Sequence, residues 1–212
     1  MNMRFAFGMV VGVGLALTAL PRSAAAAPRT HDGFFFQGSL GFGPGWLTET
    51  YDDDAFLFDE ISFSGLTVHP EILIGGTLAP GLVLGGALTG HSMVNPTAEV
   101  DGQEAETEDT TVNFSQLSAF VHYYPSPAQG LYLHGSLGVV GASITVDDDT
   151  TESDAVGFTL GAGVGYDFWI ANEWSLGPQF RFTYAHLSGE EEEVEFTDSF
   201  ISPTLSLSVT YH

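Results

Sequence analysis

The most constraining feature of this chain is a strict alternation of apolar and polar residues with a period of two. The final segment, ISPTLSLSVTYH, shows it plainly, because apolar residues occupy every second position from Ile201 to Tyr211 and Ser or Thr residues lie between them. A period of two places the two sets on opposite faces of an extended strand. The segment is therefore predicted to be a β-strand that separates an apolar environment from a polar one.

The same alternation recurs in eight segments, which predict eight strands at residues 33–46, 62–78, 82–94, 112–125, 131–146, 155–169, 175–188 and 199–211. Short connectors at 79–81, 126–130 and 170–174 alternate with much longer connections. In an up-and-down antiparallel meander, every second connection emerges at the same end. This order predicts tight turns at one end of the molecule and long loops at the other.

The long connections carry most of the negative charge. Most of the 27 Asp and Glu residues fall in four segments, 47–60, 95–111, 147–154 and 189–198. Beyond residue 27 the chain has only Arg29 and Arg181 as basic residues and no lysine. Because binding of nucleic acid through its phosphates needs clustered Lys and Arg, no nucleic-acid partner is expected.

The N-terminal residues have the features of a secretory signal. Arg4 precedes an apolar run from Phe5 to Leu20, and the small-residue stretch PRSAAAAP follows. The run is too short for a spanning helix, which needs about 20 residues. We therefore predict a signal peptide at 1–27 and one domain at 28–212. The chain has no cysteine, which excludes disulfides, thiolate metal sites and cysteine nucleophiles.

The two faces of the predicted strands differ in the way that a membrane barrel requires. The apolar face of every strand lacks charged residues, whereas the opposite face collects polar ones such as Gln37, His69, Glu71 and Arg181. A soluble core would not tolerate so many buried polar groups. The pattern predicts an all-β fold, an eight-stranded antiparallel up-and-down transmembrane β-barrel with its apolar face toward lipid. A soluble barrel of the lipocalin kind is the alternative, and it would turn the apolar face inward.

Taken together, the strand pattern resembles the eight-stranded bacterial outer-membrane β-barrel family, the type seen in the transmembrane domain of outer-membrane protein A. The resemblance implies a monomer in the outer membrane, in contact with outer-membrane lipid and lipopolysaccharide. In that family the last strand ends in an aromatic residue that the barrel-assembly machinery reads, whereas here Tyr211 precedes a terminal His212. Aromatic residues near the strand ends are interpreted as two interfacial girdles, at Trp46, Phe63, Tyr123, Tyr124, Phe168, Trp169, Trp174, Tyr184, Phe196 and Tyr211.

The inward face contains a candidate polar network. Glu71 and Arg181 lie at similar heights above the tight turns, so we predict that they pair across the lumen. Asp167, His69 and His91 share the inward parity and are assigned to the same network. His122 and His134 also point inward, and the histidines are expected at scattered heights, which disfavours a metal site. A polar gate in a narrow ion or small-solute channel is an alternative function for the network.

A second alternative is a lipid A-modifying hydrolase. His186-Leu187-Ser188 is similar to the His-x-Ser motif of the lipid A deacylase family, also eight-stranded barrels, in which Ser is the nucleophile and His the base. The resemblance would make His186 and Ser188 the catalytic candidates, on the outward face where an acyl chain could reach them. Gly189 and Glu190 depart from the family pattern after the Ser. No catalytic activity is expected.

The acidic loops offer oxygen ligands for Ca²⁺ or Mg²⁺, although no EF-hand spacing is present. The candidate ligands are Asp52, Asp53, Asp54, Asp147, Asp148 and Asp149, together with the run from Glu190 to Glu193. No resident cofactor is expected apart from such loop-bound ions. The sequence thus predicts a small outer-membrane barrel with a polar, filled lumen, four acidic extracellular loops and a structural or surface-interaction role.

Overall fold

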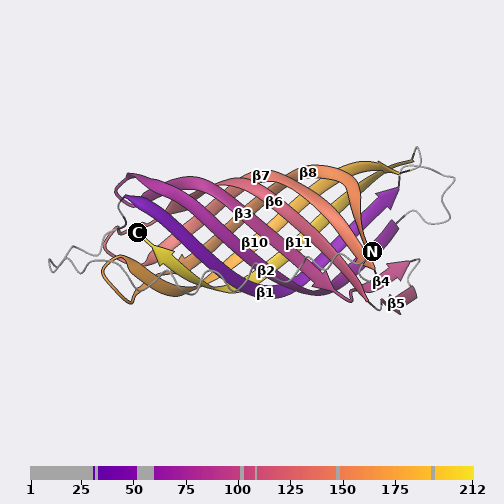
Figure 1. The fold of residues 1–212 in the computed structure, drawn as a ribbon, viewed down its shortest axis with the longest axis horizontal. Helices are drawn as coiled ribbons and strands as arrows, with labels where there is room; N and C mark the ends of the chain where they lie inside the picture. Colours follow the sequence, from indigo (N-terminus) through magenta and orange to yellow (C-terminus); the bar gives the residue numbers. More distant parts are fainter. Residues whose placement is uncertain are drawn as a thin grey trace, which may run out of the picture.

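The computed structural model describes residue 31 and residues 33–51, 60–100, 103–107, 109–146, 149–191 and 194–212. The predicted signal peptide at 1–27 lies outside them. Nearly all described residues lie in antiparallel strands that form the wall of a barrel (Figure 1). The strands are β1 (Phe34–Tyr51), β2 (Glu60–Ala79), β3 (Leu82–Val94), β4 (Thr97–Val100), β5 (Gln103–Glu106), β6 (Thr110–Tyr123), β7 (Leu131–Val146), β8 (Asp149–Tyr166), β9 (Phe168–Trp169), β10 (Trp174–Glu191) and β11 (Val194–Tyr211).

Eight of the described strands close into a ring. β1 pairs with β2 on one side and with β11 on the other, and the order around the ring is β1, β2, β3, β6, β7, β8, β10, β11. Each strand therefore pairs with its neighbours in an up-and-down order, and the closed sheet leaves no free edge. The predicted eight-stranded antiparallel barrel is confirmed. Among the described residues, no helix is long and apolar enough to cross a membrane.

The strands run further than predicted toward the long connections. β1 continues to Tyr51, β8 begins at Asp149 and β11 begins at Val194. Part of the acidic segment 95–111, predicted as a loop, instead forms the hairpin β4–β5, and β4 also pairs with β2. The strands are longer than the alternating segments because their backbone N–H and C=O groups still need partners beyond the apolar belt, and they find them on the neighbouring strands. The long-loop end of the barrel is thus built largely of paired strands.

The tight turns lie at the opposite end, where the C-terminus is also found (Figure 1). The turn between β2 and β3 is made by Ala79, Pro80 and Gly81, as its Pro-Gly pair predicts. Gly81 has a φ of +79°, a conformation that side chains rarely adopt, and its carbonyl accepts a hydrogen bond from the Tyr124 amide at 2.7 Å. This turn therefore connects consecutive strands directly and sets their register.

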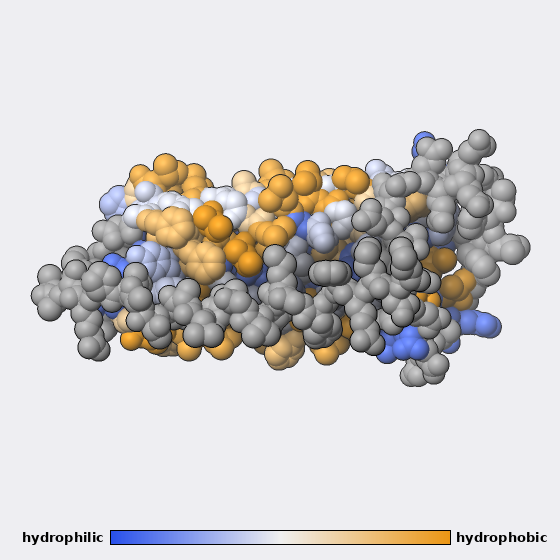
Figure 2. Space-filling view, in the orientation of Figure 1, coloured by the Kyte–Doolittle hydropathy of each residue, from blue (hydrophilic) through white to orange (hydrophobic). Residues whose placement is uncertain are grey.

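The outer face of the barrel is apolar, as predicted. Hydrophobic side chains run along the body of the barrel, and the strongly hydrophilic ones gather at the end that carries β4 and β5 (Figure 2). On β11 the outward apolar residues extend from Ile201 to Tyr211, about the 9–11 residues that a tilted transmembrane strand needs. Leu205 is 61% exposed and Leu207 57% exposed. Such a surface matches hydrocarbon, and the soluble, inward-turned alternative is wrong.

Four aromatic residues assigned to the girdles are instead inside the barrel, among them Trp169, whose ring centroid lies 4.6 Å from that of the buried His212. Tyr124 is buried beside Asp167 at the tight-turn end. Phe196 is buried, and Phe63 is partly buried and packs against the same apolar cluster at the long-loop end. These residues were misplaced because they lie near strand ends, where closeness to the interface does not reveal on which face a side chain lies. Trp46, Tyr123 and Phe168 are exposed on the outer surface, as a girdle requires.

Candidate functional site

The centre of the lumen holds one buried ion pair. Arg181 on β10 and Glu71 on β2 project inward from different sides of the ring, and Arg181 Nη2 lies 3.4 Å from Glu71 Oε1. The two side chains are 2% and 4% exposed. A buried charge without a partner costs several kcal/mol, so each of these residues depends on the other. The structure thus brings together the two charged residues that the sequence placed at one height.

Amide and hydroxyl groups complete this network. Arg181 Nη2 donates to Gln179 Oε1 at 3.0 Å, which also accepts from the Tyr132 hydroxyl at 2.8 Å. Gln179 Nε2 in turn donates to Ser39 Oγ at 2.8 Å and to Glu71 Oε1 at 3.3 Å. The sequence analysis did not single out Gln179 or Tyr132 as network members, although the inward parity of both follows from the alternation. The pair is therefore part of a wider hydrogen-bonded network that meets the guanidinium at Nη2, whereas Nε and Nη1 of Arg181 are buried without a hydrogen-bond partner among the described residues.

Glycines on β8 make room for the large side chains of this layer. A Cβ on Gly165 would lie 2.3 Å from the Tyr132 ring, and one on Gly163 would lie 3.0 Å from Arg181 Cδ. Separations this short are not tolerated without displacement. Gly165 therefore makes room for the Tyr132 ring, whereas at Gly163 the nearest obstacle is the Phe180 carbonyl oxygen of β10, which would lie 2.4 Å from a Cβ.

The inward histidines form two pairs and are not scattered singly. His69 Nδ1 and His91 Nε2 are 2.9 Å apart, and Gln116 Nε2 lies 3.2 Å from His91 Nδ1. His122 Nε2 and His134 Nδ1 are also 2.9 Å apart. Each pair joins residues at facing positions of two adjacent strands. Among the described residues no three of these four histidines converge, as expected, but they pair two by two. Each pair satisfies polar atoms that a crowded lumen would otherwise leave without a partner.

Apolar layers fill the lumen on both sides of the charged pair. Toward the long-loop end, the ring of Phe114 stacks on Phe200 with centroids 4.3 Å apart, and Met93 and Leu187 pack in the same cluster. Toward the tight turns the filling residues are Phe35, Leu73, Val83, Ala87, Phe120, Tyr124 and Tyr132. An eight-stranded barrel is just wide enough for its own side chains. The charged pair is consequently sealed between two packed layers.

Asp167 lies apart from the central pair. It is buried at the tight-turn end, where the Tyr124 hydroxyl donates to Oδ2 at 2.9 Å and the Thr210 hydroxyl donates to Oδ1 at 3.3 Å. The polar residues assigned from sequence to one network therefore divide between separate layers. Glu71 and Arg181 form the central one, His69 and His91 lie on the long-loop side of it, and Asp167 lies at the opposite end of the lumen.

The long-loop end has an acidic rim beyond the girdle. Past Trp46 the outward positions become polar, as at Thr48 and Ser199, so this level lies outside the membrane-spanning part. Asp198 faces inward here opposite Glu49, which also accepts a hydrogen bond from the Tyr51 hydroxyl. Burial, together with the negative charge of Glu49, raises the pKa of Asp198 to about 7. Between about pH 4 and pH 7, the folded rim therefore keeps a proton on Asp198 that the unfolded chain has released.

This proton predicts a pH-dependent stability with a definite sign. Because the pKa of Asp198 rises from an ordinary value of 3.8 to about 7 on folding, stability should fall as the pH rises from about 4 to 7. Asp198→Asn should remove that slope and raise the free energy of unfolding at pH 8 by about 1–4 kcal/mol. Urea unfolding between pH 4 and pH 8 measures both. Glu195→Gln, which changes an exposed carboxylate on the same strand, should leave the slope intact; an unchanged slope in Asp198→Asn would refute the assignment.

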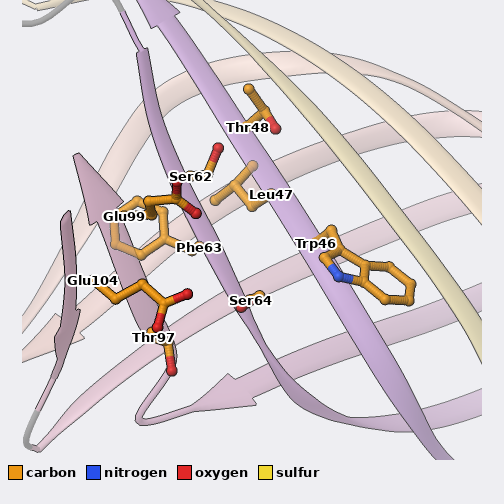
Figure 3. Close-up of a pocket in the computed structure, with 9 residues that line it drawn as sticks. All are labelled: Trp46, Leu47, Thr48, Ser62, Phe63, Ser64, Thr97, Glu99 and Glu104. Carbon is orange, nitrogen blue, oxygen red and sulfur yellow. The ribbon is translucent and has the colours of Figure 1, made fainter. Parts of the chain in front are cut away.

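A pocket of about 320 Å³ opens beside this rim, between β1, β2 and the β4–β5 hairpin. Glu99 and Glu104 pair across the hairpin, and their carboxylates point toward β2 and Phe63, whereas the Trp46 ring points away (Figure 3). The lining residues are Trp46, Leu47, Thr48, Ser62, Phe63, Ser64, Thr97, Glu99 and Glu104. The pocket combines hydroxyl groups, aromatic surface and two acids. The sequence analysis did not predict this pocket, because three of its lining residues, Thr97, Glu99 and Glu104, belong to a hairpin that was predicted to be a loop.

The two catalytic candidates lie on the outer surface of β10. Ser188 is exposed and His186 is partly buried, and His186 Nδ1 lies 3.4 Å from the hydroxyl of Ser199 on β11. The structure therefore places His186 against Ser199, across the β10–β11 pair.

Most loop candidates for cation binding lie outside the described residues, namely Asp52, Asp53, Asp54, Asp147, Asp148, Glu192 and Glu193. Asp149 begins β8, and Glu190 and Glu191 end β10. The side chains of these three residues belong to the part of the chain that the structure leaves undescribed.

The predicted polar lumen is only partly correct, because apolar layers lie on both sides of the polar one. A closed ring of strands with an apolar outer belt and an interior filled by its own side chains defines an outer-membrane β-barrel. A family model described as the autotransporter β-domain matches residues 44–209, and the chain belongs to this family. The protein is a small barrel of the bacterial outer membrane, as predicted. No curated protein matches the sequence significantly.

Several solved structures are similar. Neisserial surface protein A (NspA) is 16% identical, with 84% of this chain and 96% of that chain covered and a TM-score of 0.48. OprG from Pseudomonas aeruginosa is 11% identical over 88% of this chain and 100% of that one, with a TM-score of 0.42. The N-terminal β-barrel domain of OprF from the same organism is 16% identical over 85% and 97%, with a TM-score of 0.41.

Proposed function

We propose that this protein is a closed, non-conducting barrel with a structural or surface-interaction role at its extracellular end. The observation that carries the proposal is the filled lumen, in which the Arg181–Glu71 layer lies between two apolar layers of buried side chains. A continuous water path would have to pass both apolar layers. The same packing counts against the narrow ion or small-solute channel.

The interaction surface in this proposal is the outer end of the barrel. The β4–β5 hairpin and the ends of β1 and β2 form the pocket that contains Trp46, Phe63, Glu99 and Glu104. The acidic segments of the long connections would repel polyanions and attract cations. Lipopolysaccharide and outer-membrane lipid are the proposed surroundings, with Ca²⁺ or Mg²⁺ bound by loop carboxylates as the link to their phosphates. We propose the barrel-assembly machinery as the partner of the C-terminal strand. We also propose that the protein is a monomer.

We further propose that the chain is not an enzyme. A Ser nucleophile needs a base within hydrogen-bond reach, about 2.6–3.2 Å. The contact recorded for His186 is with Ser199, at 3.4 Å. This arrangement favours a surface role for His186 and Ser188 over the deacylase reading.

Conductance in planar lipid bilayers tests the proposal directly. The full-length mature chain should give no resolvable conductance steps at 1 M KCl, because both apolar layers block ions. A double variant with Phe114→Ala and Phe200→Ala, which removes the stacked rings of the outer layer, should still be blocked by the layer near the turns. Regular single-channel steps from the unmodified protein, abolished by Arg181→Met, would establish the channel instead.

A further inference from the structure

A cluster of metal-ligating side chains lies at the tight-turn end of the lumen, away from the central ion pair. His31 precedes β1, Asp167 lies between β8 and β9, and His212 follows β11. All three are buried, and one ligand atom from each lies within 4.8 Å of the others. Residues far apart in sequence, including one from each end of the described chain, therefore converge at one point.

Each of the two imidazole rings has one nitrogen fixed by a hydrogen bond to an oxygen atom, as is usual for histidines that bind a metal. His31 Nε2 lies 3.0 Å from the carbonyl oxygen of Gln129, which can only accept, so Nε2 carries the proton and Nδ1 of the neutral ring has a lone pair. His212 Nε2 lies 2.9 Å from Ser175 Oγ. His212 Nδ1 then donates the hydrogen bond of 2.9 Å that joins it to His31 Nδ1, and a metal ion would take the place of that proton. Ligating histidines usually have their second nitrogen fixed by such a carbonyl or polar group.

The carboxylate is also supported by its neighbours. Asp167 Oδ2 lies 3.8 Å from His212 Nε2 and accepts a hydrogen bond from Tyr124, whose ring stacks on His31 at 3.6 Å. The Thr210 hydroxyl donates to Oδ1. Hydrogen bonds of this kind orient a ligating carboxylate without using all of its lone pairs.

We propose that His31, Asp167 and His212 form a binding site for a divalent transition-metal ion of the kind that imidazole favours, with Zn²⁺ as the representative. Zn–N bonds of about 2.0–2.1 Å to both Nδ1 atoms, across their present separation, correspond to an angle of about 90° at the metal. A small rotation of either imidazole ring would increase the N–Zn–N angle toward the tetrahedral value. Three protein ligands leave a fourth position for water.

Access to this site comes from the same end of the barrel. His31 also lines a pocket of about 380 Å³, together with Gly33, Thr77 and residues of the β2–β3 turn. The pocket thus reaches the His31 side chain from the tight-turn end, without crossing the packed lumen. Bound there, the ion would tie the segment before β1 to the end of the chain and close this mouth of the barrel.

Isothermal titration of the refolded full-length mature chain with ZnCl₂ tests the proposal. Excess Mg²⁺ should be present, because it occupies carboxylate sites without competing well for imidazole. We expect one Zn²⁺ per chain with micromolar or tighter affinity, and at least a tenfold loss in His31→Ala and in Asp167→Asn. His186→Ala, which removes a histidine from the outer surface, should bind as the unmodified protein does. No binding in the unmodified protein, or binding that survives His31→Ala, overturns the site.

A second readout separates this cluster from the histidine pairs of the lumen. Cu²⁺ bound at the site should show nitrogen hyperfine splitting in its electron paramagnetic resonance spectrum, and His31→Ala should reduce that splitting. Loss of binding in a His69→Gln, His91→Gln double variant with retention in His31→Ala would assign the ion to the lumen and refute the proposal. His31 lies outside every strand, so His31→Ala should still fold. A heat-modifiable gel band checks that it does. The test therefore does not depend on His212→Ala, which alters the end of β11 and can fail to fold.

Discussion

Arg181→Met should destabilise the barrel by about 3–5 kcal/mol, the usual cost of leaving one member of a buried ion pair without its partner. Methionine fills much of the volume of arginine but removes the guanidinium that lies 3.4 Å from Glu71 Oε1. Glu71 would keep its contacts to Ser39 and Gln179, neither of which carries charge. Equilibrium unfolding in urea with the protein in lipid vesicles, followed by tryptophan fluorescence, measures the loss.

The double variant with Arg181→Met and Glu71→Gln distinguishes a stranded charge from a packing defect. Removing both charges should restore most of the lost stability, because neutral side chains of similar volume often replace a buried pair with little cost. Thr183→Val changes a buried polar residue two positions along the same face of β10 to an isosteric apolar one, and it should cost about 1 kcal/mol or less. If the double variant is no more stable than Arg181→Met, the pair does not couple electrostatically.

The faces of the barrel strands were predictable because parity depends only on local alternation. Once Ile201 to Tyr211 were assigned outward, the inward positions of Gln179, Arg181 and Thr183 on the neighbouring strand followed the same rule, and their burial agrees. Glu71 and Arg181 could be placed at one height because each lies a similar distance from a tight turn. Local periodicity and turn position therefore carry most of the fold.

Side-chain contacts between strands could not be read in this way, because a register shift such as the one between Thr77 and Ala79 in β2 gives no signal in the alternation. The pairing of His69 with His91 depends on the register of β2 against β3, in which Thr67 lies opposite Met93, and a slip of one residue would separate the rings. His31 lies before the first alternating segment and His212 after the last apolar position, so neither gave a periodic signal. Their approach at 2.9 Å follows from closure of the ring between β1 and β11.

The β4–β5 hairpin shows a different limit. Segment 95–111 is rich in acids, and charge of this kind is typical of a solvated loop. Yet it contains Asp101-Gly102, a dipeptide that favours tight hairpin turns, between Thr97–Val100 and Gln103–Glu106. The acidic composition of this segment predicts a loop and its turn dipeptide predicts a hairpin. The hairpin forms because a strand beyond the membrane does not need an apolar face. The pocket at the outer end could not be predicted without this hairpin, because Thr97, Glu99 and Glu104 line it.

Leu207→Arg should destabilise the barrel by about 2–4 kcal/mol, because it places a charge on the lipid face near the middle of the bilayer. Leu207 is 57% exposed and lies near the centre of the outward run on β11, between Leu40 on β1 and Pro178 on β10. An exposed leucine on a soluble protein makes few contacts, and its replacement by arginine would change stability by about 0.5 kcal/mol at most. The size of the loss in lipid vesicles thus reports the medium around the residue.

Ser199→Arg is the matched control, on the same strand and the same face. Ser199 pairs with Thr48 and His186 at the level beyond Trp46, where the outer surface has become polar. Arginine there should cost about 0–1 kcal/mol, the value expected near the interface. Equal losses at the two positions would mean that the cost arises from the strand and not from lipid. A larger loss at Leu207 than at Ser199 would place the hydrocarbon boundary between these two levels, and would place the acidic rim and its pocket in water at the cell surface.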